Sequence, residues 1–287
     1  MNMNMNRNMN LKKIRTALLV LIAAATAAVF LLPLVWMLST GFKNDFEALA
    51  GQMNFIPKKP TFDNFVDGLT GELMNVPITR WIFNSLFAGA AGTALVLWID
   101  SMAAYALARL PDVPLRRVLF PMFVASLMIP GVLTFLPMYL EFNQFGLINT
   151  YYALVLPYTA GAFGVFLLYQ FFVSFPREIE EAARIDGANK WQVYASVLLP
   201  SSVPIMVTLG IFTFMGVYND FVWPLYATTS PEMRTITAGI AMMAHGSYTQ
   251  AYGKLMAMTT IAALPVLLVF IFGQRSFVRA ITQSGIK

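Results

Sequence analysis

Long apolar stretches separated by shorter polar segments dominate the hydropathy pattern of this chain. About six of them reach the roughly 20 residues that an α-helix needs to cross about 30 Å of hydrocarbon. They cover residues 18–38, 81–107, 118–140, 151–173, 202–226 and 255–272. Because these runs are continuous and do not alternate with polar residues, helices are favoured over a β-barrel. The pattern predicts an all-α membrane protein with six transmembrane helices.

Composition supports a location in lipid. Hydrophobic residues make up 58% of the chain and charged residues 11%, whereas a soluble domain averages about 25% charged. Basic residues at 12–15 precede the first apolar run, as in a secretory signal. That run is longer than a typical signal core, so a retained anchor is favoured over cleavage after Ala28. Residues 1–10 repeat Met and Asn without periodicity and are expected to be disordered.

Lys and Arg are distributed unequally between the two sides of the predicted topology. With the N-terminus inside, 13 of the 19 basic residues fall in inner segments. The positive-inside rule then places both termini in the cytoplasm. Topology accounts for the net charge of +5, so no nucleic-acid partner is needed. The chain has no cysteine, which excludes disulfides, thiolate metal sites and cysteine nucleophiles.

The predicted organisation contains two long connections, one on each side of the membrane. Its parts are a cytoplasmic tail at 1–17, a first helix at 18–38, an external loop at 39–80, a five-helix core at 81–275 with an inner loop at 174–200, and a cytoplasmic tail at 276–287. The external loop is expected to be a lid or linker. No internal repeat is evident, which disfavours secondary transporters built from paired repeats.

The inner loop, SFPREIEEAARIDGANKWQVYASVLLP, is polar and charged, and its residues predict two short helices. Pro176 suits a first helical position, and acidic residues follow it near the positive end of the helix dipole. Gly187 after Asp186 supplies a stop. The second piece runs to Pro200 and carries an apolar stripe at helical spacing. That stripe comprises Trp191, Tyr194, Val197 and Leu198.

Two interpretations of this loop are open on physical grounds alone. In the first, a hairpin on the cytoplasmic membrane face uses the small side chains of Ala182 and Ala183 to pack closely against a partner. In the second, the loop is a surface connection in which Glu180 and Arg184 pair along the helix for a few tenths of a kcal/mol. The residues themselves favour neither.

The loop also resembles a known signature. Glu181-Ala182-Ala183, three residues, Gly187, nine residues, then Val197, one residue, Leu199 and Pro200 are similar to the EAA motif of permease subunits in binding-protein-dependent ABC importers. The runs FGLINT at 145–150, IDGA at 185–188 and YNDFVWPL at 218–225 resemble the carbohydrate, maltose-type branch. The similarity extends from about Asn84 to the C-terminus. Tyr218 and Val197 stand where the family more often has Trp and Ile.

The resemblance implies a multi-pass protein of the bacterial inner membrane with a type I ABC importer permease fold, in which this loop forms a coupling helix. Glu181 would offer its carboxylate to a basic group of an ATPase, Ala182 and Ala183 would fit against the ATPase surface, and Gly187 would allow the turn. Asp186 is a further residue of this predicted ATPase-coupling site. The implied partners are a second permease subunit, two cytoplasmic ATPases that bind ATP and Mg, and an external solute-binding protein. This chain would bind no cofactor itself.

Charged residues are costly inside lipid, so they usually face protein or water. Asp100 is expected to pack against a partner subunit or a polar neighbour. Asp220 could line the substrate path or face outer-leaflet water, and Tyr218, Asn219 and Asn84 are further candidates for that path. Four tryptophans near predicted helix ends are expected to anchor at the membrane interfaces. They are Trp36, Trp81, Trp98 and Trp223.

Enzymatic functions find little support in the sequence. No GxxxxGK[ST] loop, HExxH or GxSxG motif is present, and a lone histidine, His245, makes no metal site. The favoured function is a non-catalytic permease subunit that imports a sugar or related carbohydrate. The alternatives are a secondary transporter driven by ions through Asp100 and Asp220, and a structural membrane scaffold. The residues do not select a sugar, an oligosaccharide or a polyol.

Overall fold

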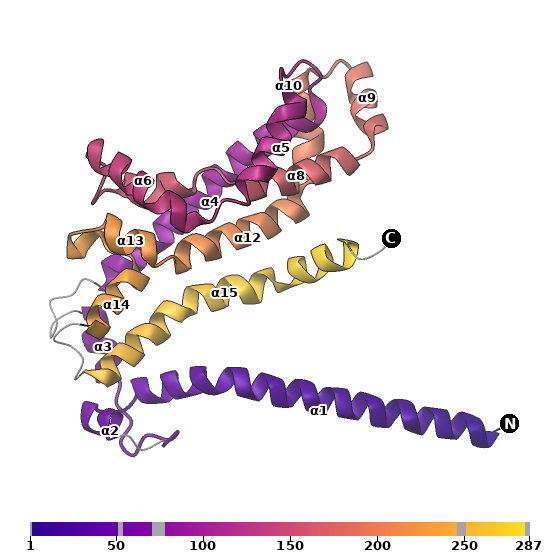
Figure 1. Cartoon of the computed structure of the whole chain (residues 1–287). Helices are drawn as coiled ribbons and strands as arrows, with labels where there is room; N and C mark the ends of the chain where they lie inside the picture. The colour runs from indigo at the N-terminus through magenta and orange to yellow at the C-terminus, as the bar shows by residue number, and fades with distance from the viewer. Residues whose placement is uncertain (1, 51–53, 71–77, 246–250, 285–287) are drawn as a thin grey trace. The chain divides into compact units, whose positions relative to one another are not determined.

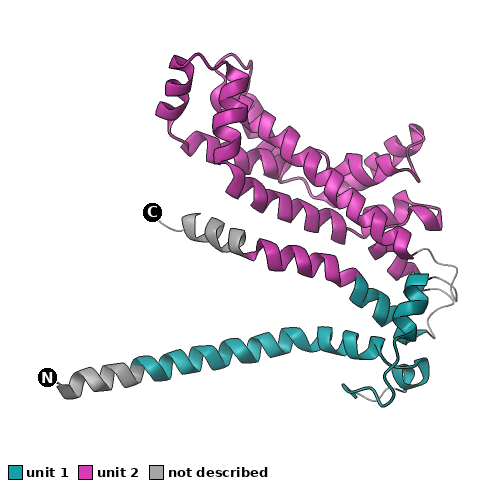
Figure 2. Ribbon diagram, turned by 180° about the vertical axis from the view of Figure 1, so that it is seen from behind, with its two compact units in different colours: residues 1–75, 243–261 teal, residues 76–242, 262–287 magenta. Residues whose placement is uncertain are grey.

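The computed structural model describes residues 2–50, 54–70, 78–245 and 251–284, with side chains for 12–50, 54–70, 78–245 and 251–274. The described residues contain helices and no strand, which confirms the all-α prediction (Figure 1). The chain divides into two compact units, shown in separate colours in Figure 2. Unit 1 comprises residues 1–75 and 243–261, and unit 2 comprises residues 76–242 and 262–287.

The helices of unit 1 come from both ends of the chain. They are α1 (Asn2–Gly41), α2 (Asp45–Leu49), α3 (Asp63–Thr70) and the first turns of α15 (Tyr252–Ser284). Unit 2 holds the remainder of α15 and most of α14 (Ile236–His245), together with all elements between α4 and η3. These are α4 (Ile78–Arg109), α5 (Arg116–Ser126), α6 (Gly131–Gln144), α7 (Tyr151–Val155), η1 (Leu156–Tyr158), α8 (Ala162–Ser174), α9 (Arg177–Ile185), α10 (Lys190–Val193), the π-helical turn η2 (Tyr194–Leu198), α11 (Leu199–Ser201), α12 (Val203–Asn219), α13 (Val222–Ala227) and η3 (Pro231–Met233).

Up to six segments of the described chain are long and apolar enough to cross a membrane. Lys12–Gly41, Ile78–Arg109 and Tyr252–Gln274 are single helices, and three further candidates are pairs of helices bent at a short break. The bends measure 100° between α5 and α6, 40° between η1 and α8, and 75° between α11 and α12. The segments predicted at 118–140 and 151–173 are therefore present as bent pairs of helices and not as single straight ones, and the six predicted spans are reached when each pair counts as one.

Prolines lie at the break between α5 and α6 and at a further break, between α12 and α13, although four other prolines lie inside helices without ending them. A proline ring clashes with the carbonyl four residues earlier in a helix. Pro130 is four residues after Ser126, where α5 ends, and Pro224 is four residues after Asp220, the residue that terminates α12. The predicted helix at 202–226 therefore divides into α12 and α13.

The predicted external loop at 39–80 contains two helices and packs within unit 1. Asn64 donates from its amide to the carbonyl oxygens of Gly41 and Lys43, at 2.9 and 2.6 Å. Asp67 forms a 3.0 Å ion pair with Lys254 at the start of α15. Residues 51–53 and 71–77 of this loop lie outside the described residues. The described part is a folded element rather than a bare linker.

The N-terminal tail also differs from the prediction. Helix α1 begins at Asn2, so residues that were expected to be disordered continue the first helix toward the N-terminus. Adding a residue to an existing helix costs less than starting one, and the apolar segment at 18–38 supplies the helix that the polar tail extends.

The core of unit 2 forms where α8 and α12 pack along α4 (Figure 1). Leu168, Phe172 and Leu198 are fully buried there. Trp81 and Trp223, expected at the membrane interfaces, are buried as well, and each indole donates a hydrogen bond to a backbone carbonyl. These two residues therefore do not face a membrane interface as predicted. Their indole N–H groups can be buried because a backbone carbonyl accepts the hydrogen bond that water would otherwise accept.

Candidate coupling site

The inner loop forms α9 and then the short elements α10, η2 and α11. Pro176 lies one position before the predicted place, as the N-cap of α9. Glu178 and Glu180 occupy the first turn, where the helix dipole favours negative charge. The two predicted helices are thus present, and the second is completed by a π-helical turn at Tyr194–Leu198.

Gly187 ends α9 through a specific hydrogen-bond pattern. Its φ is +91°, a left-handed conformation that glycine adopts without a steric penalty. The Gly187 amide donates to the Arg184 carbonyl at 3.0 Å, and the Ala188 amide donates to the Ala183 carbonyl at 2.9 Å. These two bonds constitute a Schellman motif, which satisfies the last carbonyls of the helix. The stop predicted at Gly187 is confirmed.

The next helix starts with a capping box that the sequence analysis missed. Asn189 accepts from the Gln192 amide, while the Gln192 side chain accepts from the Asn189 amide. Asn followed three residues later by Gln was the available signal. In the predicted stripe, Tyr194 and Leu198 are buried, but Trp191 remains 57% exposed.

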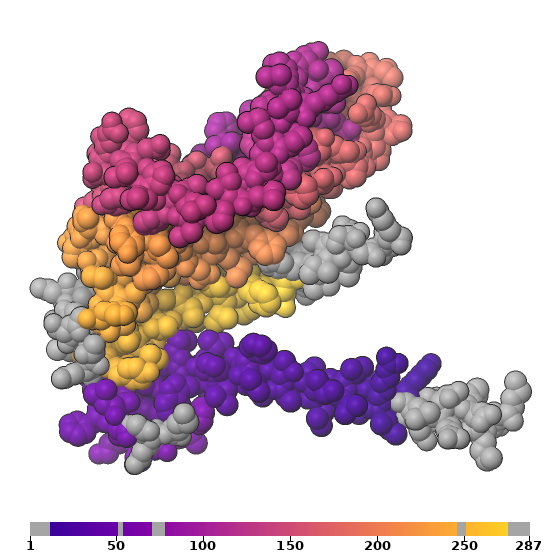
Figure 3. Space-filling view, in the orientation of Figure 1, coloured from indigo at the N-terminus to yellow at the C-terminus, as the bar shows by residue number. Residues whose placement is uncertain are grey.

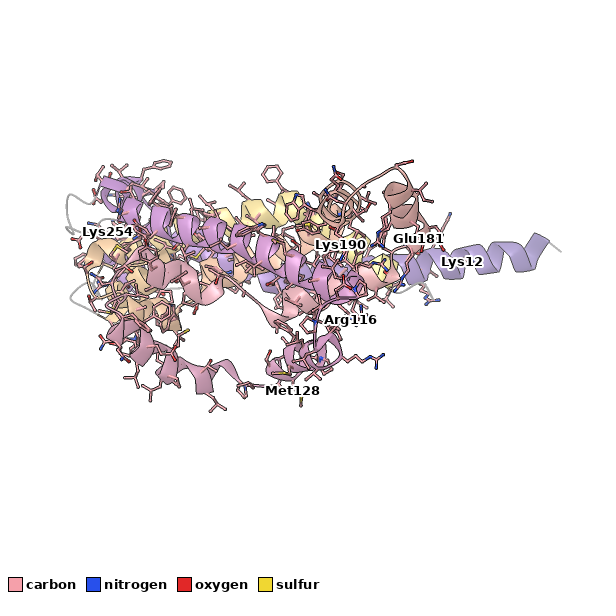
Figure 4. The ribbon with its side chains drawn as sticks, turned by 90° about the horizontal axis from the view of Figure 1, so that it is seen from above. Lys12, Arg116, Met128, Glu181, Lys190 and Lys254 are labelled. Carbon is pink, nitrogen blue, oxygen red and sulfur yellow. The ribbon has the colours of Figure 1, made fainter. Side chains whose placement is uncertain are left out.

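One face of α9 is free of the rest of unit 2. Glu178, Glu181, Ala182 and Ile185 are exposed, and their spacing places them on one side of the helix. Ile185 is 86% exposed. The segment lies on the surface at one end of unit 2 (Figure 3), and Figure 4 shows Glu181 toward the same end as Lys190 and Arg116.

The opposite face of α9 packs against the core. Ala183 is half-buried beside the core residues, whereas Asp186 and Gly187 are exposed. Of the residues predicted to fit an ATPase, Ala182 therefore points outward and Ala183 inward. The roles of Glu181, Ala182, Ala183, Asp186 and Gly187 toward a partner stay predictions.

Glu180 forms a buried ion pair that the sequence analysis did not predict. Its Oε1 lies 2.8 Å from Nε of Arg109, at the end of α4, and the two side chains are 5% and 3% exposed. Neither atom has a hydrogen bond of good geometry, so the attraction is chiefly between charges. The second interpretation of the loop paired Glu180 with Arg184, but the partner of Glu180 in the structure is Arg109. Sequence spacing shows only pairs along one helix, and Arg109 belongs to another.

The residues predicted for the substrate path are placed very differently from one another. Asn84 is buried, donates to the carbonyls of Glu232 and Arg234, and accepts from the Tyr151 hydroxyl. Tyr218 is also buried and donates to the Ala262 carbonyl. Both side chains are therefore engaged within unit 2.

Asn219 and Asp220, at the end of α12, are more accessible. Asn219 is exposed and Asp220 half-buried. The Asp220 carboxylate accepts from the hydroxyl of Tyr158 and from the amide of Val222. Asp220 lies at the break between α12 and α13. A role in the substrate path stays a prediction for Asn84, Tyr218, Asn219 and Asp220.

Asp100 is buried in the middle of α4 against the start of α8. Its Oδ1 accepts from the Gly161 amide at 3.2 Å, and its Oδ2 has no hydrogen-bond partner. A Cβ at Gly164 would overlap that oxygen. Asp100 was expected to pack against either a partner subunit or a polar neighbour. The structure supplies a polar neighbour within the chain, the Gly161 amide. Among the described residues, no three potential metal ligands come together.

Comparison with known proteins identifies the family. The model of the binding-protein-dependent transport system inner membrane component matches residues 100–283, more than half of the chain. The chain belongs to this family. A putative ABC transporter permease protein, ORF2, from Caldicellulosiruptor sp. is 35% identical over 89% of this chain and 91% of its own length. The diacetylchitobiose uptake system permease protein NgcG from Streptomyces coelicolor is 33% identical over 90% and 84%.

Solved structures agree with the fold of this inner membrane component. A bacterial ABC transporter involved in the import of the acidic polysaccharide alginate contains a chain with a TM-score of 0.78 at 20% identity, covering 92% of this chain and 96% of that one. The type I importer permease fold and a multi-pass membrane location are thereby confirmed. The chain is a non-catalytic permease subunit of a binding-protein-dependent importer. This assignment overturns the alternative of an ion-driven secondary transporter.

Proposed function

We propose that α9 is the coupling helix through which this permease subunit is driven by a cytoplasmic ATPase. The observation that carries the proposal is the 86% exposure of Ile185 on a helix whose other face is fixed by a buried ion pair. Single exposed apolar side chains are common on protein surfaces. Ile185 carries weight because it lies on the same exposed face as Glu181 and Ala182 of the run that resembles the EAA motif. Glu181 supplies a carboxylate beside it, and Ala182 allows close approach.

The proposed assembly follows from this orientation of α9. The inner loop and both termini face the cytoplasm, which agrees with the excess of basic residues in the inner segments. A second permease subunit completes the path, two ATPase subunits bind ATP and Mg, and an external binding protein delivers the solute. In support, one structural relative at a TM-score of 0.60 was solved in complex with an alginate pentasaccharide-bound periplasmic protein.

We propose a carbohydrate as the substrate class. Its support comes from relatives named for diacetylchitobiose and for trehalose/maltose, the latter being MalG of Thermococcus litoralis, 29% identical over 96% of this chain. The ATPases supply the energy, and this chain supplies half of the path. Binding of ATP closes the ATPases, displaces α9, and switches the permease between inward-open and outward-open states.

Affinity purification of the tagged chain in mild detergent tests the assembly. Mass spectrometry should identify an ATPase and a second permease, and hydrolysis should rise when a sugar-loaded binding protein is added. Recovery of the chain alone, with no ATPase subunit and no ATP hydrolysis in the purified sample, would contradict the proposal.

Variants of the exposed face test the role of α9 directly. Ala182→Arg and Ile185→Asp should release the ATPase during purification while the chain still inserts into the membrane. Ser196→Asp is the matched control because Ser196 is exposed in the same inner loop but lies outside α9. If the two α9 variants retained as much ATPase as the Ser196→Asp control, α9 would not be the docking helix.

A further inference from the structure

Three residues of α4 contact the inner loop at 174–200, which contains α9 and α10. Ser101 shares a 2.8 Å hydrogen bond with the Tyr194 hydroxyl, and Tyr105 donates to the Lys190 carbonyl at 2.8 Å. Arg109 completes the series. Because the three residues are four positions apart, they lie on one face of α4. That face is directed at the segment that follows α8.

Arg109 makes the closest connection to α9 itself. One guanidinium nitrogen donates to the carbonyl of Phe175, two residues before α9, and Nε lies 2.8 Å from Glu180 inside α9. Both ends of the connection are almost completely withdrawn from solvent. A buried charge that loses its partner is strongly destabilising, so the two side chains stay together whenever α9 moves.

The other end of α4 is held to an outer segment in the same manner. Trp81 donates to the Pro231 carbonyl, Asn84 donates to the carbonyls of Glu232 and Arg234, and Ser85 accepts from the Ile236 amide. The helix between these contacts and Arg109 contains no proline. From 81 to 109 it extends about 42 Å at 1.5 Å per residue.

We infer that Arg109 and Glu180 are positioning residues that make α4 and α9 move as one body. A displacement of α9 by the ATPase would then reach the outer segment at 231–236 through α4. Three of the other apolar segments are broken by bends of 40° to 100°, which makes the unbroken α4 the stiffer connection within unit 2. The inference rests on the proposed coupling function of α9.

Neutralising both partners tests the inference without leaving an unpaired buried charge. In the complete transporter, R109Q/E180Q should lower transport per ATP hydrolysed at least fivefold. The control is K190Q/D112N, which removes the 2.5 Å pair between Lys190 and Asp112 in the same region. Those side chains are 60% and 73% exposed, so their loss should leave transport per ATP unchanged.

A second measurement reads the movement at the other end of α4. The chain contains no cysteine, so E232C introduces a single site for a fluorescent label in this subunit. In the otherwise unmodified complex, ATP should change the emission of the label, and R109Q/E180Q should abolish that change. An unchanged emission with ATP in the unmodified complex would overturn the inference, as would wild-type transport per ATP in R109Q/E180Q.

The two proposals fail in different ways. If the unmodified chain purifies without an ATPase, the coupling function itself is wrong. If the ATPase is present and stimulated but R109Q/E180Q behaves like the unmodified complex, only the role of Arg109 and Glu180 is wrong. If R109Q/E180Q does not assemble, E180D replaces it in both measurements, because it keeps the negative charge but shortens its reach toward Arg109.

Discussion

Gly239 of α14 lies directly against the indole ring of Trp81 in α4, so closely that a Cβ at 239 would overlap the ring. Trp81 is also fixed by its hydrogen bond to Pro231 and cannot move aside freely. This contact is one of several that hold η3 and α14 on α4.

Gly239→Ala should therefore destabilise unit 2. Overpacking of a well-packed site typically costs about 1–3 kcal/mol, and the purified complex should unfold at a lower temperature. Gly216→Ala is the control, since a Cβ at that position in α12 meets nothing within 4 Å. Equal melting temperatures for the two variants would argue against the close packing of Trp81.

Asn84 and Asn219, both candidates for the substrate path, should respond differently to alanine. Asn84→Ala removes a fully buried amide that is the partner of the Glu232 and Arg234 carbonyls and of the Tyr151 hydroxyl. Losing these part-buried hydrogen bonds should cost about 1–3 kcal/mol in total. Asn219→Ala removes an exposed side chain and should not change the melting temperature.

Uptake kinetics then separate structure from substrate contact. Asn84→Ala should reduce the amount of folded transporter and leave the KM for uptake unchanged. A raised KM for Asn84→Ala at normal melting temperature would instead place Asn84 on the path. For Asn219→Ala, a raised KM would support its predicted role there.

Gly187→Val should uncouple the transporter. Space around Gly187 is open, but its φ of +91° is strained for a β-branched residue, so the end of α9 would distort. ATPase activity should continue while uptake per ATP falls. Gly187→Asn is the matched variant because asparagine tolerates this conformation, and it should retain most of the coupling. Full coupling in Gly187→Val would contradict the role of the Schellman turn.

Asp100→Asn and Asp100→Leu should separate a structural carboxylate from an ion-binding one. Asn retains an oxygen for the Gly161 amide, so uptake should remain close to normal. Leu leaves that amide unpaired inside the membrane, and the transporter should lose about 1–3 kcal/mol of stability. Melting temperature and uptake check both results. Loss of uptake in a stably folded Asp100→Asn protein would show that transport needs the negative charge of Asp100.

Local sequence was sufficient for the features of this protein that depend on neighbouring residues. The apolar segments, the polar inner loop and the end of α9 at Gly187 all follow from spacing, polarity and backbone freedom within a few residues. The breaks at Pro130 and Pro224 do not follow from proline alone, because Pro121 and Pro137 lie inside α5 and α6. Which proline ends a helix depends on the packing around it.

Tertiary packing decided which polar groups meet. Asn84 binds carbonyl groups about 150 positions away in the chain, and Glu180 pairs with Arg109 on another helix. Spacing along one helix reveals neighbours three or four residues apart, but a partner on another helix depends on how the helices pack. For that reason the family signature identified α9, while only the folded chain showed that α4 holds it.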